Sequence, residues 1–248
     1  MVALSVNVNK VATLRNSRGG QVPSVIDAVK TCVAAGAPGI TVHPRQDQRH
    51  IRPGDVHDIA ALLAQLTGPD RRRIEFNIEG DPGPELIDLV LSVTPTQCTL
   101  VPTTPGEITS HAGWPPDTPV DRLGAIVARL QRARIRVSVF VDPEPEPIEW
   151  AARLGADRVE VYTEPFARAF EQSAAEGQAA FARYVRAARL AHSLKLGVNA
   201  GHDLDLQNLA LFKTLPHLDE VSIGHALVSH ALWVGLDRSV KDYLAAVE

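Results

Sequence analysis

Hydrophobic and polar positions along the chain follow two patterns that alternate eight times. The first is a short run, rich in Val or Ile, as expected for strands that are buried on both faces. These runs cover residues 4–9, 39–44, 73–79, 97–102, 136–142, 158–164, 195–201 and 220–225. The pattern therefore predicts eight buried strands.

The second pattern is a longer segment with helical periodicity, and one such segment follows each run. The segments are 22–36, 55–66, 84–93, 120–133, 147–155, 171–194, 206–215 and 231–247. Strands that alternate with helices favour a parallel sheet with crossover helices. Eight such units in 248 residues predict a (β/α)8 TIM barrel with extra short helices, and we expect residues 1–248 to form a single catalytic domain.

Composition narrows the possible functions. The chain is 45% hydrophobic and 22% charged and has a net charge of −4, so it has no basic surface typical of nucleic-acid binding. The first residues do not resemble a secretory signal, and no apolar run approaches the roughly 20 residues that span a bilayer. We expect a cytoplasmic protein with neither nucleic acid nor membrane as a partner.

Polar residues follow the strands at their carboxyl ends, which meet at one mouth in a barrel and usually carry the active site. Histidine, carboxylate and arginine side chains gathered there suit proton transfer on an anionic substrate. The candidates are Asn7, Asn9, Lys10, Arg15, Arg18, His43, Arg45, His50, Glu75, Asn77, Glu79, Glu160, Tyr162, Asn199, His202, Gly224 and His225.

Several candidates allow a second interpretation from sequence alone. His43 is either catalytic or a hydrogen-bonded residue at the rim. Glu75 is either catalytic or held in an ion pair with an arginine from residues 71–73, because an unpaired buried carboxylate is costly. His202 is either catalytic or part of a turn.

Two other patterns concern ions. Gly224 and His225 open a helix, so they either bind a phosphate at its N-terminus or form a plain strand-to-helix turn. His43, His202 and His225 could in principle bind zinc. Neither an HxH nor an HExxH spacing is present, and the neighbouring Arg and Lys would oppose a cation, so we expect no metal.

Six motifs in the same order resemble the pyridoxine 5′-phosphate synthase family over essentially the whole chain. They are VNVNKVATLRNSRGG (6–20), GITVHPRQDQRHI (39–51), IEFN (74–77), LVP (100–102), VNAGHDL (198–204) and IGHALV (223–228). The resemblance implies condensation of 3-amino-2-oxopropyl phosphate with 1-deoxy-D-xylulose 5-phosphate to give pyridoxine 5′-phosphate, phosphate and water. It also implies no cofactor, no metal and a homo-octamer built from dimers.

The resemblance assigns roles by position. It implies that His43 and Glu75 are general bases, that His202 is a general acid, and that Glu160 stabilises charged intermediates. Residues implied to hold the amino-ketone phosphate are Asn7, Arg18, Gly224 and His225. Those implied to hold the deoxyxylulose phosphate are Asn9, Lys10, Arg45, His50 and Thr109. Asp203 follows the motif histidine and is expected to contact substrate.

The chain departs from the family pattern at two places. Many members have Asp-His where this chain has Asn9-Lys10, and glycine is common where it has Asp203. Lys10 can still bind a phosphate or a hydroxyl, so we expect a subfamily variant that retains activity. Residues 103–116, which are rich in Pro and Gly, are the candidate lid over the mouth.

Two other functions stay open at this stage. One is a barrel lyase or aldolase that acts on a different phosphorylated ketose. The other is a barrel that only binds phosphosugars, which is disfavoured because a pure binder does not need three acid/base residues at one mouth. Glu75→Gln is expected to separate these functions, since a binder keeps its affinity while an enzyme loses turnover.

Overall fold

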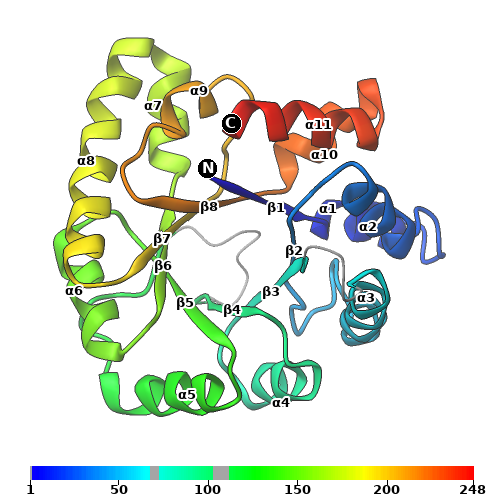
Figure 1. The fold of residues 1–248 in the computed structure, drawn as a ribbon, viewed down its shortest axis with the longest axis horizontal. Helices are drawn as coiled ribbons and strands as arrows, with labels where there is room; N and C mark the ends of the chain where they lie inside the picture. The colour runs from blue at the N-terminus through cyan, green and yellow to red at the C-terminus, as the bar shows by residue number, and fades with distance from the viewer. Residues whose placement is uncertain (1, 68–72, 103–111) are drawn as a thin grey trace.

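The computed structural model describes residues 2–67, 73–102 and 112–248, and its eight strands close into a parallel barrel (Figure 1). Each strand pairs with the next one along the chain, and the first strand closes the barrel against the last. The strands are β1 (Ala3–Asn7), β2 (Gly39–Val42), β3 (Glu75–Gly80), β4 (Gln97–Leu100), β5 (Arg136–Val141), β6 (Arg158–Tyr162), β7 (Gly197–Gly201) and β8 (Leu218–Ile223). All eight predicted strands and the barrel itself are confirmed.

Helices surround the barrel (Figure 1). They are α1 (Asn9–Asn16), α2 (Val25–Ala34), α3 (Pro53–Leu66), α4 (Pro84–Val93), α5 (Val120–Arg132), α6 (Pro145–Leu154), α7 (Glu164–Gln172), α8 (Ala174–Ser193), α9 (Leu209–Phe212), α10 (His225–Val234) and α11 (Leu236–Val247). In the part of the chain described, none of them combines the length and the apolar character that crossing a membrane requires.

Two of the predicted helical segments are divided in the structure, which accounts for some of the extra helices. Ser173 has extended backbone angles, and its hydroxyl accepts a hydrogen bond from the Glu176 N–H at 3.1 Å, so it caps a new helix. Gly235 has a φ of 85° and separates α10 from α11 in the same way. Helix α1 was not predicted, because its sequence carries no clear apolar periodicity.

The interior of the barrel is polar below the mouth. Ser5 and Thr41 are joined by a hydroxyl–hydroxyl hydrogen bond of 2.6 Å, and Asn77 donates to Thr41 at 3.3 Å. Thr99 in turn donates to the Asn77 Oδ1 at 3.0 Å. Strand positions between these residues, such as Val6 and Ile40, face the helices and are fully buried in the apolar core. Branched apolar layers usually fill a TIM barrel; here a hydrogen-bonded polar layer supports the mouth.

Arg15, which the sequence grouped with the mouth residues, has a structural position. It is 3% exposed, and its guanidinium forms a two-pronged ion pair with Asp55 on α3, at 2.5 Å and 2.9 Å. Its Nη2 also donates to the His50 carbonyl at 3.2 Å. Arg15 therefore fastens α1 to α3 and to the segment that carries His50.

Loss of this ion pair should destabilise the protein strongly. We expect Arg15→Leu to lower the free energy of unfolding by about 3 kcal/mol, because it leaves the Asp55 carboxylate poorly solvated and unpaired. Urea denaturation measures the change.

Lys241→Ala is the matched control, since Lys241 pairs with Asp237 on the exposed surface of α11 and should contribute less than about 0.5 kcal/mol. An Arg15→Leu protein that loses no more stability than this control would contradict the structural role of Arg15.

Candidate active site

The carboxyl ends of β1 and β2 are joined by asparagine side chains. The Asn9 N–H donates to Asn7 Oδ1 at 3.0 Å, and Asn9 Oδ1 accepts a hydrogen bond from the His43 N–H at 2.9 Å. The Asn9 carboxamide is thus used to fix the backbone of His43. Lys10 lies in the first turn of α1, and its charge contributes to the lowered pKa of His50.

His43 lies beside a carboxyl group of β3. Its Nδ1 is 4.0 Å from Glu79 Oε2, and Asn7 Nδ2 donates to the same oxygen at 3.5 Å. Burial, reinforced by the charges of His50 and Arg45, lowers the pKa of His43 to about 3. The imidazole is therefore neutral at ordinary pH and able to accept a proton.

Glu79 and Glu160 are buried carboxyl groups that interact. Burial raises the pKa of Glu79 well above its usual value, and the charges of Glu160 and Glu220 raise it further. Burial and the charge of Glu220 raise the pKa of Glu160 to about 8. These groups hold protons that solvent-exposed carboxyls would release, which is a property of groups that exchange protons in active sites.

Glu160 is closely surrounded. Its Oε2 has no hydrogen-bond partner among the described residues, while its Oε1 lies only 2.3 Å from the position that a Cβ at Gly201 would occupy. Gly201 on β7 therefore leaves the room that the carboxyl group occupies in this position. The oxygen without a partner is a buried polar atom, and such atoms are rarely left without a hydrogen bond in folded proteins.

His202 follows Gly201 in a strained turn. His202 and Asp203 have φ values of 82° and 57°, in the left-handed region that residues other than glycine rarely adopt. The Thr163 hydroxyl contacts the carbonyls of Gly201 and His202 and stabilises this turn. The His202 ring packs 5.1 Å from the Phe140 ring, so its orientation is fixed on the side facing β5.

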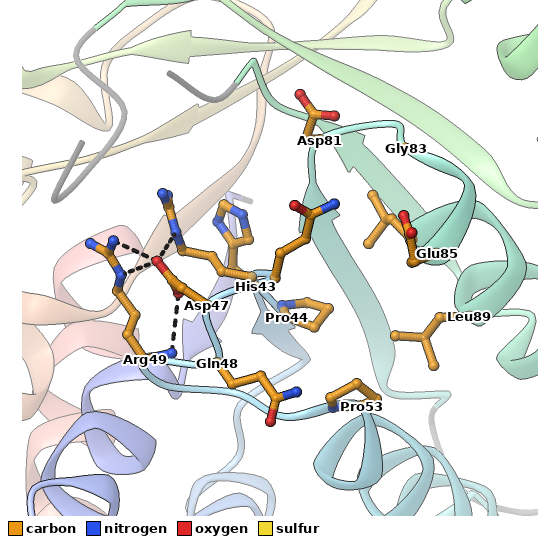
Figure 2. Close-up of a pocket in the computed structure, with 13 residues that line it drawn as sticks. His43, Pro44, Asp47, Gln48, Arg49, Pro53, Asp81, Gly83, Glu85 and Leu89 are labelled. Carbon is orange, nitrogen blue, oxygen red and sulfur yellow. Dashed lines mark hydrogen bonds and ion pairs between the residues drawn. The ribbon is translucent and has the colours of Figure 1, made fainter. Parts of the chain in front are cut away.

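A cavity of about 640 Å³ extends from His43 between the segments that follow β2 and β3 (Figure 2). Arg45, Asp47 and Arg49 line one side of it, and Asp81 and Glu85 line it as well. The His50 ring lies 5.8 Å from the His43 ring, and burial, followed by the charge of Arg45, lowers the pKa of His50 to about 4.

Glu75 does not lie at the mouth, so its predicted placement is wrong. It is the first residue of β3, at the amino end of the barrel, where it forms a two-pronged ion pair with Arg136, the first residue of β5. Partial burial raises the pKa of Glu75, but the hydrogen bond from Arg136 and the charges of Arg136, Arg158 and Arg73 together outweigh burial and hold the pKa below its usual value. The alternative of an ion pair is the one found, with Arg136 as its partner.

Glu79 lies on the same strand and was among the candidates from sequence, but the role of general base was assigned to Glu75. Glu75 and Glu79 are four residues apart on one strand and point to the same interior side, because side chains alternate with a period of two. They are separated by about 13 Å along the strand. The predicted strand, 73–79, already has Glu79 at its carboxyl end and Glu75 near its amino end, and β3 keeps this order, so the position along the strand is the signal that distinguishes them.

The remaining predicted residues lie around the mouth at different depths. Gly224 approaches Asn7 so closely that an added Cβ would lie 3.0 Å from the Asn7 Cβ. His225 begins α10 and is exposed, as are Arg18 and Asp203. Thr109 and most of the candidate lid lie outside the described residues. No group of three or more His, Cys, Asp or Glu side chains within residues 2–67, 73–102 and 112–248 is placed to hold a metal ion.

Comparison with known proteins gives one family. The family described as "Pyridoxal phosphate biosynthesis protein PdxJ" matches residues 4–248. Pyridoxine 5′-phosphate synthase of Bacteroides fragilis (strain YCH46) is 54% identical over 98% of both chains. The enzyme of the same name from Cytophaga hutchinsonii is 49% identical, again over 98% of both chains.

Solved structures resemble the chain in fold at low identity. 3-Hexulose-6-phosphate synthase from Salmonella typhimurium has a TM-score of 0.63 and 15% identity, with all of both chains covered. Phosphoribosylanthranilate isomerase from Thermotoga maritima has a TM-score of 0.58 and 13% identity over 100% of this chain and 98% of that one. At such identities the likeness concerns the barrel alone.

The buried carboxyl of Glu160 should make stability depend on pH. Its pKa is 4.5 when exposed and about 8 in the folded protein, so the folded state binds the proton more tightly. Its contribution is complete below pH 4.5 and is lost as pH rises towards about 8. Glu160→Gln cannot ionise, so we expect its free energy of unfolding to fall less than that of the wild type across this interval.

Urea denaturation at several pH values measures the difference. Glu149→Gln, an exposed substitution on α6, is the control and should follow the wild-type pH dependence. Parallel curves for Glu160→Gln and the wild type would show that Glu160 is ionised throughout the interval.

Proposed function

The chain belongs to the PdxJ family of pyridoxal phosphate biosynthesis proteins, and we propose from the geometry of its barrel mouth how it carries out the synthesis of pyridoxine 5′-phosphate. The reaction condenses 3-amino-2-oxopropyl phosphate with 1-deoxy-D-xylulose 5-phosphate and releases phosphate and water. The observation that carries the assignment of roles is the pairing of neutral His43 with the buried carboxyl of Glu79, 4.0 Å away.

The reaction requires several proton transfers on different sides of one substrate. The amine attacks a ketone and forms an imine with loss of water; protons then move between carbon and oxygen, phosphate leaves, and attack on a second carbonyl closes the ring. Each transfer needs a positioned acid or base. Neutral histidines at this mouth can accept protons, and protonated carboxyls can donate them, so the mouth supplies both bases and acids.

His43 and Glu79 act as the proton-transfer pair. His43 is neutral and accepts a proton from the attacking amine. Glu79 begins protonated, donates to the hydroxyl group that leaves as water, and as a carboxylate accepts the next proton from carbon. Their proximity and their opposite pKa shifts support this order of events. Glu79 thus takes the role that the sequence had given to Glu75.

His202 and Glu160 complete the set. His202 is the general acid, in the turn that follows β7, and its fixed turn supports a defined direction for proton donation. Glu160 faces the developing positive charge of the imine, and the unpartnered Oε2 supports this role. We propose that residues 1–248 work as one catalytic domain, because the strands that bear these four residues extend from β2 to β7.

Two groups of residues bind the phosphates. Lys10, Arg45 and His50, with Asn9 beneath them and with Thr109, hold the deoxyxylulose phosphate. Arginine forks and a lysine charge suit a phosphate dianion. Asn7, Arg18, Gly224 and His225 hold the amino-ketone phosphate at the N-terminus of α10, where backbone N–H groups point outward. Asp203 contacts substrate from the turn after β7.

The protein assembles with copies of itself. Leu232, Trp233 and Val234 are consecutive residues at the end of α10, and Trp233 is 87% exposed. Three exposed apolar side chains of this size mark a surface that a second copy can cover. The homo-octamer built from dimers and the cytoplasmic location are part of this proposal.

Replacement of Glu79 should stop the reaction. We expect Glu79→Gln to lower kcat by about 10²- to 10⁴-fold, because a general acid/base contributes on that scale. Turnover of both substrates, followed through pyridoxine 5′-phosphate absorbance and released phosphate, measures it.

Glu75→Gln is the matched control and should keep nearly the wild-type kcat while it loses stability at the amino end of the barrel. If Glu75→Gln abolishes turnover and Glu79→Gln does not, the assignment to Glu79 is wrong.

A charge on the apolar surface of α10 should weaken assembly. We expect Trp233→Glu to sediment as a smaller species than the wild type, because the introduced carboxylate would be desolvated in the contact. Leu194→Glu, at an exposed apolar position after α8, is the control and should keep the wild-type mass. Identical masses for all three proteins would remove α10 from the contact.

A further inference from the structure

One carboxylate in the cavity of Figure 2 is held by two arginines. Asp47 Oδ2 lies 2.8 Å from Arg49 Nε, 2.5 Å from Arg49 Nη2 and 3.7 Å from Arg45 Nε. The other oxygen, Oδ1, accepts a hydrogen bond from the Arg49 backbone N–H at 3.2 Å. Figure 2 shows Asp47 and Arg49 on one side of the cavity, beside His43.

The contacts of Asp47 are those of an anion in an arginine site. A single oxygen receives both donors of one guanidinium edge and the charge of a second arginine, as a phosphate oxygen does. The hydrogen bond from Arg49 is the main cause that lowers the pKa of Asp47, so the group is ionised at ordinary pH. Asp47 therefore neutralises part of the positive charge in this side of the cavity.

The three side chains are able to rearrange. The Asp47 side chain is 42% exposed and that of Arg49 is 35% exposed, whereas Arg45 is only 10% exposed. The Asp47 carboxylate can turn to solvent at little cost, because exposed ion pairs contribute little stability. Arg45, being more buried, stays in place as the fixed part of the site.

Charge directs an incoming phosphate to this side. Asp81 and Glu85 line the other side of the cavity and would repel a dianion, while their oxygens can accept hydrogen bonds from sugar hydroxyls. Two arginines with Asp47 carry a net charge of +1, and two arginines with a phosphate dianion carry none. Replacement of Asp47 by phosphate thus completes the neutralisation of the pair.

We propose that Asp47 is a specificity-determining residue whose carboxylate holds Arg45 and Arg49 in the geometry of a phosphate site and is displaced by the phosphate of the substrate. A ligand binds favourably by displacing Asp47 only if it carries more negative charge and more acceptor oxygens than one carboxylate. A phosphate ester dianion anchored at His43 meets this condition, and carboxylated metabolites of the same size do not. The proposal rests on the proposed function, since it names the part of that site that selects phosphate.

Binding of inorganic phosphate to the whole protein tests this without any turnover. We expect Asp47→Asn to bind phosphate about five- to tenfold more tightly than the wild type in isothermal titration calorimetry, because the competing charge is gone. Asp47→Glu keeps the charge and should bind like the wild type. Glu85→Gln removes the same charge from the same cavity without touching the arginines, so it should change affinity less than Asp47→Asn.

Weaker or unchanged phosphate binding in Asp47→Asn, with circular dichroism and thermal melting like the wild type, would overturn the proposal. So would an equal gain in Glu85→Gln, because the effect would then be one of overall charge. The steady-state KM for 1-deoxy-D-xylulose 5-phosphate should fall in Asp47→Asn by the same factor as the phosphate dissociation constant. A protein that binds phosphate as expected but makes no pyridoxine 5′-phosphate would contradict the proposed function alone.

Discussion

Burial of the Glu79 and Glu160 carboxyls inside the upper part of the barrel is the constraint on which the mouth depends. Burial and the charge of Glu160 raise the pKa of Glu79, and burial and the charge of Glu220 raise the pKa of Glu160 to about 8, so both carboxyls hold their protons more tightly than exposed ones do. Such burial is tolerable because the layer below consists of hydrogen-bonded Ser, Thr and Asn side chains instead of branched apolar ones. The polar interior and the acid/base chemistry are two aspects of one arrangement.

The histidines of the mouth are shifted in the opposite direction. Burial and neighbouring positive charge keep His43 and His50 neutral, while burial keeps the carboxyls protonated. The place where His43 and Glu79 meet therefore carries little net charge, while the ion pairs of Asp47 with Arg45 and Arg49 lie in the cavity beside it. A centre that is close to neutral fits the proposed function, in which two dianionic substrates enter the same opening.

The sequence was sufficient to predict the architecture. It was not sufficient to predict how far each side chain lies from the carboxyl-end mouth of the barrel. All eight strands were predicted because Val- and Ile-rich runs separated by helical segments have one plausible closed arrangement. Glu75 and Glu79 share the same interior side of β3, so periodicity could not separate them; only their positions relative to the two ends of the barrel could. Arg15 was assigned to the mouth because it follows β1 in the sequence. Its ion-pair partner Asp55 is 40 residues away, so no local sequence pattern could predict their contact. Ser173 and Gly235 divide two of the predicted helical segments. The prediction missed these breaks because apolar periodicity continues on both sides of each residue.

The close contact between Gly201 and Glu160 has a consequence for how this protein can change. A methyl group at position 201 would overlap the Oε1 of Glu160, so alanine there would require that the carboxyl move or disappear. Glycine at position 201 thus sets where the acid at position 160 lies, because any larger residue would turn the carboxyl away from its present place. Changes at the two positions are therefore coupled, although 41 residues of sequence separate them.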